Sequence, residues 1–164
     1  MASHHYLSKA AHLAVMAELA WRGYNVALPE IDVGDDIFAV NDTSGNMWRI
    51  QVKYGKIKKQ KKKSIAAIFP CRKDQLEKAD SPELYYVFVF RHTVWRFAIF
   101  PRVALLTHHQ TNSWGSPFVN RQNQKNYLNF RFSLTDVGVL TYGSGAAKKD
   151  VTANLEKWDE IPYN

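Results

Sequence analysis

Three kinds of feature are scarce in this sequence, and each limits the classes of protein to which the chain can belong. A single cysteine, Cys71, excludes an internal disulfide and a metal cage of cysteine ligands, and it agrees with a reducing compartment. There is no run of about 20 apolar residues and no leader-like N-terminus, so we expect a soluble, cytoplasmic protein without a membrane partner. Acidic residues number 15 against 22 basic ones, which gives a net charge of +7. This imbalance favours an anionic partner, with nucleic acid first.

The remaining composition is typical of a globular protein. Hydrophobic residues make up 46% of the 164 positions and charged residues 23%, and both values argue against disorder. The length predicts a single domain over residues 1–164.

The most informative stretch spans residues 34–53. Two apolar runs there flank an Asp-Thr-Ser-Gly-Asn turn, which predicts a β-hairpin. Because side chains alternate along a strand, Gln51 and Lys53 share one face of the second strand. In a symmetric hairpin, Asp36 lies opposite the neighbourhood of these two residues. A carboxylate, an amide and an ammonium group are therefore expected to converge at one end of a sheet.

The segment before this hairpin predicts a helix and a short strand. Apolar residues recur at helical spacing over residues 8–22, with Ser8 as the expected N-cap and Gly23 as the expected stop. A strand is expected over residues 24–28. Together with the hairpin, these elements give the order α-β-β-β.

Asp36, an apolar strand, a turn and Ile50-Gln51-Val52-Lys53 resemble the Asp…(Asp/Glu/Gln)-x-Lys core of the PD-(D/E)xK nuclease superfamily. That superfamily includes restriction endonucleases, Mrr-type enzymes and Holliday junction resolvases, and glutamine in the middle motif resembles the Mrr-type variant. The resemblance implies an α/β fold with a restriction-endonuclease-like αβββαβ core, in which helices flank a mixed sheet. It places this core over residues 8–109 and a C-terminal extension over 110–164. It also implies an endonuclease that hydrolyses DNA phosphodiester bonds with Mg²⁺ or Mn²⁺. Many members cut duplexes as dimers, so a homodimer is part of the expectation.

The resemblance also implies a role for each motif residue. Asp36 is catalytic and binds the metal, while the Gln51 side chain and the Val52 backbone carbonyl supply neutral oxygen ligands. Lys53 is catalytic, because it orients the attacking water or stabilises the charge that develops on the phosphoryl group.

The acidic segment at residues 30–36 leaves a choice of acid. Asp35 and Asp32 are reserve candidates for the metal-binding position, whereas Asp36 immediately precedes the apolar strand. A solvated acidic loop is the plain structural alternative.

Many superfamily members carry a metal-binding glutamate on the first helix, and here His12 occupies that place. Glu18 lies about one and a half turns later and faces the other way. His12 has two interpretations, a core-edge histidine bonded to a backbone carbonyl or a catalytic residue. Imidazole suits Mn²⁺ better than Mg²⁺, so an active enzyme should favour Mn²⁺.

Basic and carboxamide side chains gather in two further segments. Six lysines occupy the eight positions 56–63, which predicts a loop or an extended hairpin arm that contacts phosphates or is merely solvated. Residues 110–125 read as a polar loop in which Trp114, Gln122 and Gln124 could also stack on bases or bind phosphates. The candidate nucleic-acid-binding residues are Lys56, Lys58, Lys59, Lys61, Lys62, Lys63, Arg121 and Lys125.

The other expected elements complete an α/β pattern. A β-branched and aromatic run at residues 84–90 predicts a central strand buried on both faces. We further expect strands over 65–69, 94–100 and 127–134, and helices over 74–78, 102–109 and 150–158.

Three functions from different classes fit these observations. The first is a metal-dependent DNA endonuclease carried by Asp36, Gln51 and Lys53. The second is a nuclease-like protein that binds nucleic acid without cutting, since the helix glutamate is missing. In the third, the polar cluster is a structural network on a protein-interaction domain.

Overall fold

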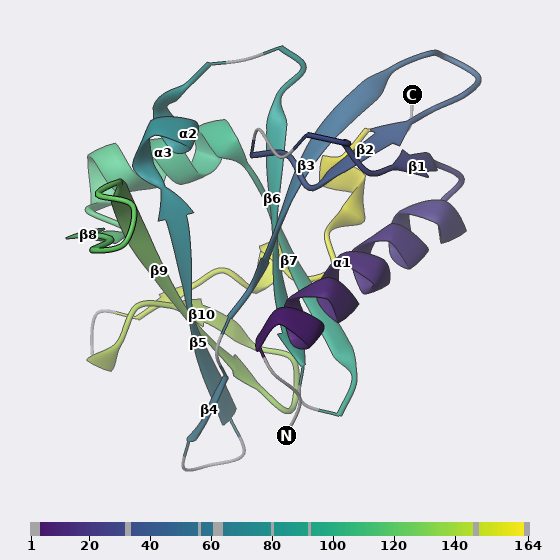
Figure 1. The fold of residues 1–164 in the computed structure, drawn as a ribbon. Coiled ribbons are helices and arrows are strands. Elements are labelled where there is room, and N and C mark those ends of the chain that lie inside the picture. Colours follow the sequence, from purple (N-terminus) through teal and green to yellow (C-terminus); the bar gives the residue numbers. More distant parts are fainter. Residues whose placement is uncertain are drawn as a thin grey trace.

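The computed structural model describes residues 4–31, 34–55, 57–60, 64–79, 81–91, 93–145 and 148–162. Two β-sheets flanked by helices make up the fold (Figure 1). The five-stranded sheet has the order β1-β2-β3-β6-β7, and the six-stranded sheet has the order β11-β10-β9-β5-β4 with β8 paired to β9. The elements are α1 His4–Trp21, β1 Asn25–Ala27, β2 Ile37–Val40, β3 Met47–Tyr54, β4 Lys58–Gln60, β5 Ser64–Arg72, α2 Lys73–Glu77, β6 Leu84–Arg91, β7 Trp95–Pro101, α3 Arg102–Asn112, β8 Ser116–Val119, β9 Asn126–Thr135, β10 Leu140–Tyr142, β11 Lys149–Asp150, and the 3₁₀ turns η2 Thr152–Asn154 and η3 Trp158–Glu160.

Helix α1 covers one face of the five-stranded sheet. Ala11, Val15 and Leu19 recur every fourth residue, so they form one stripe along the helix, and all three are fully buried against that sheet. This stripe holds the polar residues of the helix at fixed positions above the first strands.

The two ends of α1 differ in how well they were predicted. Gly23 adopts a left-handed φ of +90°, and its N–H donates to the carbonyl of Ala20 at 3.0 Å. The predicted glycine stop is therefore confirmed. The prediction of Ser8 as N-cap is wrong, because the helix begins a full turn earlier, at His4.

The predicted β-hairpin is formed by β2 and β3. Ile37 pairs with Ile50 in antiparallel register, and the turn is closed by a bond from the Asn41 N–H to the Asn46 carbonyl at 2.9 Å. Alternation along β3 turns Ile50 toward α1 and Gln51 toward the opposite side. The two faces of β3 thus separate apolar packing from polar chemistry.

Strand β6 lies at the centre of the molecule and is buried on both faces, as predicted. Tyr86, Phe88 and Phe90 belong to a core between the two sheets, whereas Val87 and Val89 belong to a second core under α1. Because both cores share this strand, β3 beside it has a rigid support.

The second sheet was not anticipated by the sequence. Strand β5 does not end near Phe69 but continues to Arg72, and it pairs with β9 from Ser64 opposite Thr135 to Arg72 opposite Tyr127. The mixed α/β class is confirmed. The expectation of one mixed sheet is corrected to two, because this pairing joins segments that lie far apart in the chain.

Two predictions in the C-terminal part are wrong. The polar segment 110–125 is not one loop, because α3 continues to Asn112 and β8 follows it. The segment 150–158 is not an α-helix. Asp150 ends β11, and the 3₁₀ turns η2 and η3 follow it. The segment nevertheless lies against the five-stranded sheet, since Leu155 forms a bridge to Ala98 of β7.

Across the part of the chain that the structure describes, no helix combines the length and the apolar character needed to cross a membrane.

Candidate active site

Asp36 and Gln51 face each other where β2 begins. The N–H of Asp36 donates to the Ile50 carbonyl at 2.9 Å, which extends the hairpin ladder one residue beyond the strand. The Oδ2 atom of Asp36 accepts the Val52 N–H at 2.7 Å and a second hydrogen bond from Nε2 of Gln51. The carboxylate and the amide predicted to meet are therefore in contact.

His12 and Lys53 complete this polar cluster from two different elements. The Nε2 atom of His12 lies 3.7 Å from Oδ2 of Asp36. Lys53 projects from β3 into the same cleft, where its charge acts on the Asp36 carboxyl. His12 therefore lies beside Asp36 at the cleft, and its catalytic role stays a prediction. Glu18 pairs instead with Arg22 at 2.5 Å.

Asp35, one of the two reserve candidates, is engaged elsewhere. Asp35 is only 5% exposed, and both of its oxygens accept bonds of 2.9 Å from the Arg49 guanidinium. That bidentate pair occupies its carboxylate. Asp32 lies outside the described residues. Asp36 is thus the acid that the hairpin presents to the cleft.

Opposing effects act on the ionisation of Asp36. Burial raises the pKa of the carboxyl above its ordinary 3.8, because a carboxylate away from water is costly. The neighbouring His12 and Lys53 charges lower the pKa, as do the hydrogen bonds from Val52 and Gln51. Burial is the strongest of these effects, so the net pKa is raised.

A chain of hydrogen bonds runs from Asp36 into the fold through Gln75, a residue that the sequence did not single out. The Nε2 atom of Gln75 donates to Oε1 of Gln51 at 2.9 Å and also to the Gly34 carbonyl. Its Oε1 accepts the Tyr86 hydroxyl at 3.2 Å. No sequence spacing ties Gln75 to Gln51, because α2 and β3 meet only in the folded chain.

The donor-to-acceptor direction of these hydrogen bonds is set by the Gly34 carbonyl, which can only accept a hydrogen bond. Gln75 must present its nitrogen there, so Gln51 presents its oxygen to Gln75 and its nitrogen to Asp36. Gly34 has a φ of +107°, and a Cβ there would lie 2.6 Å from Nε2 of Gln75. Burial raises the pKa of Tyr86, so its hydroxyl remains a donor.

A cleft of about 550 Å³ opens over this cluster. One wall comes from α1 and β3 and carries His12 and Lys53. The opposite wall comes from β8, β9 and the turn between them, which contribute Asn120, Asn123 and Lys125. The cleft therefore joins the Asp36 cluster to a segment about 85 residues further along the chain, and the sequence alone did not connect the two.

The candidate nucleic-acid-binding residues fall into three groups. Lys125 lines the cleft, and Arg121 is exposed on the same turn. Lys58 is exposed on β4, the short strand that pairs with β5. Lys59 also lies in β4, but its side chain is not described, and the residues outside the described part are Lys56, Lys61, Lys62 and Lys63.

The prediction that Trp114 is available to stack on bases is wrong. Its side chain is only 4% exposed. The indole lies between the rings of His108 and Tyr142, with ring centroids 4.1 and 3.8 Å away. Trp114 is thus part of the core between the sheets.

The residues around Asp36 fit a divalent cation in part. No group of three or more His, Cys, Asp or Glu side chains that could hold a metal occurs among the described residues. His12 and Asp36 nevertheless present donors 3.7 Å apart, and two ligands of one ion lie about 3 to 4 Å apart. For Gln51 to add an oxygen, its amide must turn, because its nitrogen now faces Asp36.

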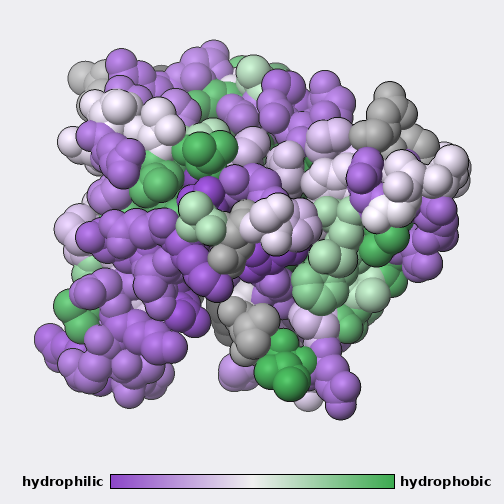
Figure 2. Space-filling model, turned by 90° about the horizontal axis from the view of Figure 1, so that it is seen from above, coloured by the Kyte–Doolittle hydropathy of each residue, from purple (hydrophilic) through white to green (hydrophobic). Residues whose placement is uncertain are grey.

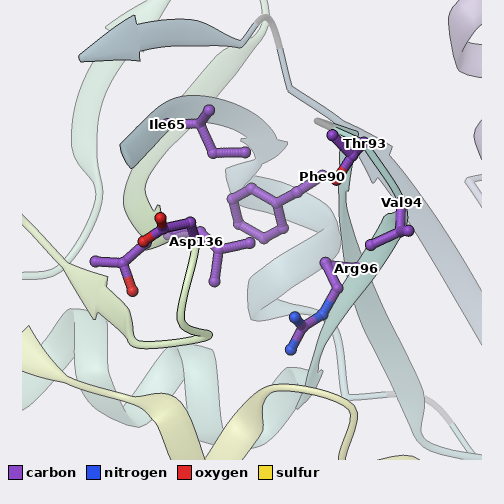
Figure 3. Close-up of a pocket in the computed structure, with 8 residues that line it drawn as sticks. Ile65, Phe90, Thr93, Val94, Arg96 and Asp136 are labelled. Carbon is purple, nitrogen blue, oxygen red and sulfur yellow. The ribbon is translucent and has the colours of Figure 1, made fainter. Parts of the chain in front are cut away.

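A smaller hollow of about 80 Å³ lies away from this cluster, between the ends of the two sheets (Figure 3). Ile65 and Phe90 form its apolar part, while Arg96 and Asp136 lie at its edge. Arg96 is paired with Glu156 at 2.9 Å. This hollow contains no cluster comparable to the one at Asp36.

The fold is mixed α/β, and the site is a polar cluster where β2 begins, beside β3. No family profile and no curated protein sequence matches the chain. Among solved structures, the chain is similar to a bacterial homing endonuclease, I-Ssp6803I, with a TM-score of 0.61 and 18% sequence identity. The similarity covers 98% of this chain and 92% of that chain. At this identity, the likeness shows that the two proteins share a fold.

Proposed function

We propose that this protein is a divalent-metal-dependent endonuclease that hydrolyses DNA phosphodiester bonds, built on the αβββαβ core of the PD-(D/E)xK superfamily. One observation carries the proposal: Asp36, Gln51, Lys53 and His12 come from three elements and line one cleft. The shared fold with a homing endonuclease supports it. The net charge of +7 suits a polyanionic substrate.

In this proposal, each side chain has a separate task. Asp36 and His12 would hold the cation, with a turned Gln51 amide and the Val52 carbonyl as neutral ligands. Bound there, a cation neutralises charge on the phosphate and lowers the pKa of a water molecule. Lys53 orients the attacking water and stabilises the negative charge that builds on the phosphoryl oxygens. The imidazole of His12 favours Mn²⁺ over Mg²⁺.

The test is nicking or linearisation of supercoiled plasmid with Mn²⁺ and with Mg²⁺. We expect cutting that EDTA stops and that Lys53→Ala lowers by at least about a hundredfold, the usual effect of losing a group that stabilises the transition state. Lys149→Ala is the matched control, since Lys149 is an exposed lysine on β11 and should leave cutting unchanged. Cutting that survives Lys53→Ala would refute the proposal.

A second function, DNA binding without cutting, is favoured by two observations. Among the described residues, Asp36 is the single carboxylate that lines the cleft, and the amide nitrogen of Gln51 occupies one of its oxygens. This function predicts DNA binding that weakens steeply with salt, together with no nicking in either metal.

A further inference from the structure

The turn between β8 and β9 is the most strongly polar part of the cleft wall. Its six residues, 120–125, read Asn-Arg-Gln-Asn-Gln-Lys, which gives two cations, four carboxamides and no acid. We call these six residues the hairpin tip. Hydrophilic residues dominate the left of Figure 2, the side on which Figure 1 shows this hairpin.

Part of the hairpin tip is used to hold its own shape. The Gln124 N–H donates to the Asn120 carbonyl at 2.8 Å, and the Asn120 side chain accepts the Gln122 N–H at 2.9 Å. The side chain of Asn123 donates to the Tyr127 hydroxyl at 3.1 Å. The tip is therefore ordered before any partner binds, so binding would cost little ordering entropy.

The base of the hairpin is rigid as well. The rings of Phe118 and Tyr127 stack, with centroids 5.4 Å apart and planes at 26°. Four consecutive residue pairs join β8 to β9, from Ser116 opposite Asn129 to Val119 opposite Asn126. The tip thus projects from a paired two-stranded ribbon.

Three side chains of the hairpin tip are not used in this way. Arg121, Gln122 and Lys125 are exposed. Among the residues that the structure describes, their side chains take part in no hydrogen bond, and the charge of Lys125 acts on the carboxyl of Asp74. These three side chains have the chemistry to bind a partner.

The position of the tip limits what that partner can be. Asn120, Asn123 and Lys125 line the same cleft as Asp36 and Lys53. A DNA segment with a phosphodiester at Asp36 must therefore pass the hairpin. The major groove of B-form DNA admits a two-stranded β-ribbon, and its base edges carry a distinct pattern of donors and acceptors.

We propose that the hairpin tip enters the major groove of duplex DNA beside the reacting phosphate and reads its sequence. The inference rests on the proposed function for where the DNA lies. The Arg121 guanidinium has the fork that matches O6 and N7 of guanine, and the Gln122 carboxamide matches N6 and N7 of adenine. Lys125, nearer the reacting phosphate, contacts the DNA backbone. Lys58, exposed on β4, would add affinity without sequence preference.

The experiment is selection of bound sequences from a randomised DNA duplex in EDTA, so that cutting plays no part. We expect the wild-type protein to enrich a motif that contains guanine and adenine at neighbouring fixed positions. Arg121→Lys keeps the charge but loses the bidentate fork, so it should abolish the guanine preference, about tenfold or more. Its total DNA affinity should stay within about threefold of wild type, because the phosphate contacts remain.

Two further variants test which side chain is responsible for the base preference. Gln122→Ala should remove the adenine preference alone. Gln110→Ala, at an exposed glutamine near the end of α3, should leave the whole motif unchanged. A motif that survives both Arg121→Lys and Gln122→Ala would overturn the inference, and so would a wild-type protein that enriches no motif.

The outcomes also separate this inference from the proposed function. Plasmid nicking without an enriched motif would overturn base reading by the hairpin tip and uphold the nuclease. An enriched motif that Arg121→Lys alters, in a protein that cuts nothing in Mn²⁺ or Mg²⁺, would uphold base reading and overturn the nuclease.

Discussion

At the scale of single residues, the raised pKa of Asp36 makes a pH dependence that can be measured without DNA. Below the ordinary pKa of 3.8, the carboxyl is protonated in both the folded and the unfolded chain, and its burial costs little. As the pH rises through the raised folded-state pKa, the folded protein must hold a carboxylate away from water. Wild-type stability should therefore fall relative to a neutral variant over that range.

The variant that tests this is Asp36→Asn in EDTA. We expect it to melt at a higher temperature than wild type at about pH 8, and the difference to narrow as the pH falls below 3.8, where the carboxyl becomes neutral in both the folded and the unfolded chain. Adding Mn²⁺ at about pH 8 should stabilise only the wild type, because only it retains the carboxylate ligand. A variant that melts below wild type at about pH 8 in EDTA would mean that the two hydrogen bonds outweigh the cost of burial.

Gln75 lines the cleft as well, and it acts on Asp36 through the amide of Gln51. By taking the oxygen of Gln51, it leaves the nitrogen on Asp36, an orientation that opposes a cation. Gln75→Ala frees that oxygen to turn toward the metal. We expect it to tighten Mn²⁺ binding by about three- to tenfold, the value of one hydrogen bond lost from the metal-free state.

This effect is measured on protein without DNA, from the electron paramagnetic resonance signal of free Mn²⁺. Gln110→Ala is the matched control, because it changes a glutamine away from the cleft. Weaker binding in Gln75→Ala would show the opposite, that Gln75 orients Gln51 for the cation.

At the scale of elements, local patterns predicted what local contacts determine. Alternation along β3 placed Gln51 and Lys53 on one face, and the apolar run of β6 announced a strand buried on both faces. Gly23 marked the end of α1 because its φ of +90° is one that other residues rarely adopt. These signals act within a few residues of one another.

The features that the sequence did not reveal depend on contacts between distant segments. Nothing near Ser64 indicates that β5 pairs with β9, so the second sheet, and with it the second wall of the cleft, went unpredicted. Trp114 looked available because its neighbours are polar, yet the ring of Tyr142 from another strand covers it. Gln75 of α2 reaches Gln51 of β3 only in the folded chain. The Asp36 end of the site was thus readable from sequence, and its opposite wall was not.

At the scale of the whole molecule, β6 joins the two cores, which bears on the prediction of one domain over residues 1–164. Phe88 packs between the sheets, and Val87 packs under α1. If the chain unfolds as one unit, a defect on either face of this strand destabilises both cores equally. If residues 110–164 unfold separately, a defect between the sheets acts on β9 and spares α1.

Phe88→Leu and Val87→Ala are a matched pair for this test, since they change adjacent residues on opposite faces of one strand. Each should cost about 1 to 3 kcal/mol of unfolding free energy. We expect each variant to accelerate amide hydrogen exchange in the slowest peptides of α1 and of β9 by the same factor, about tenfold for each 1.4 kcal/mol. Faster exchange in β9 alone with Phe88→Leu, and in α1 alone with Val87→Ala, would instead divide the chain into two units. In that case, the two walls of the cleft would belong to units that unfold independently, and DNA would be needed to hold the hairpin tip opposite Asp36.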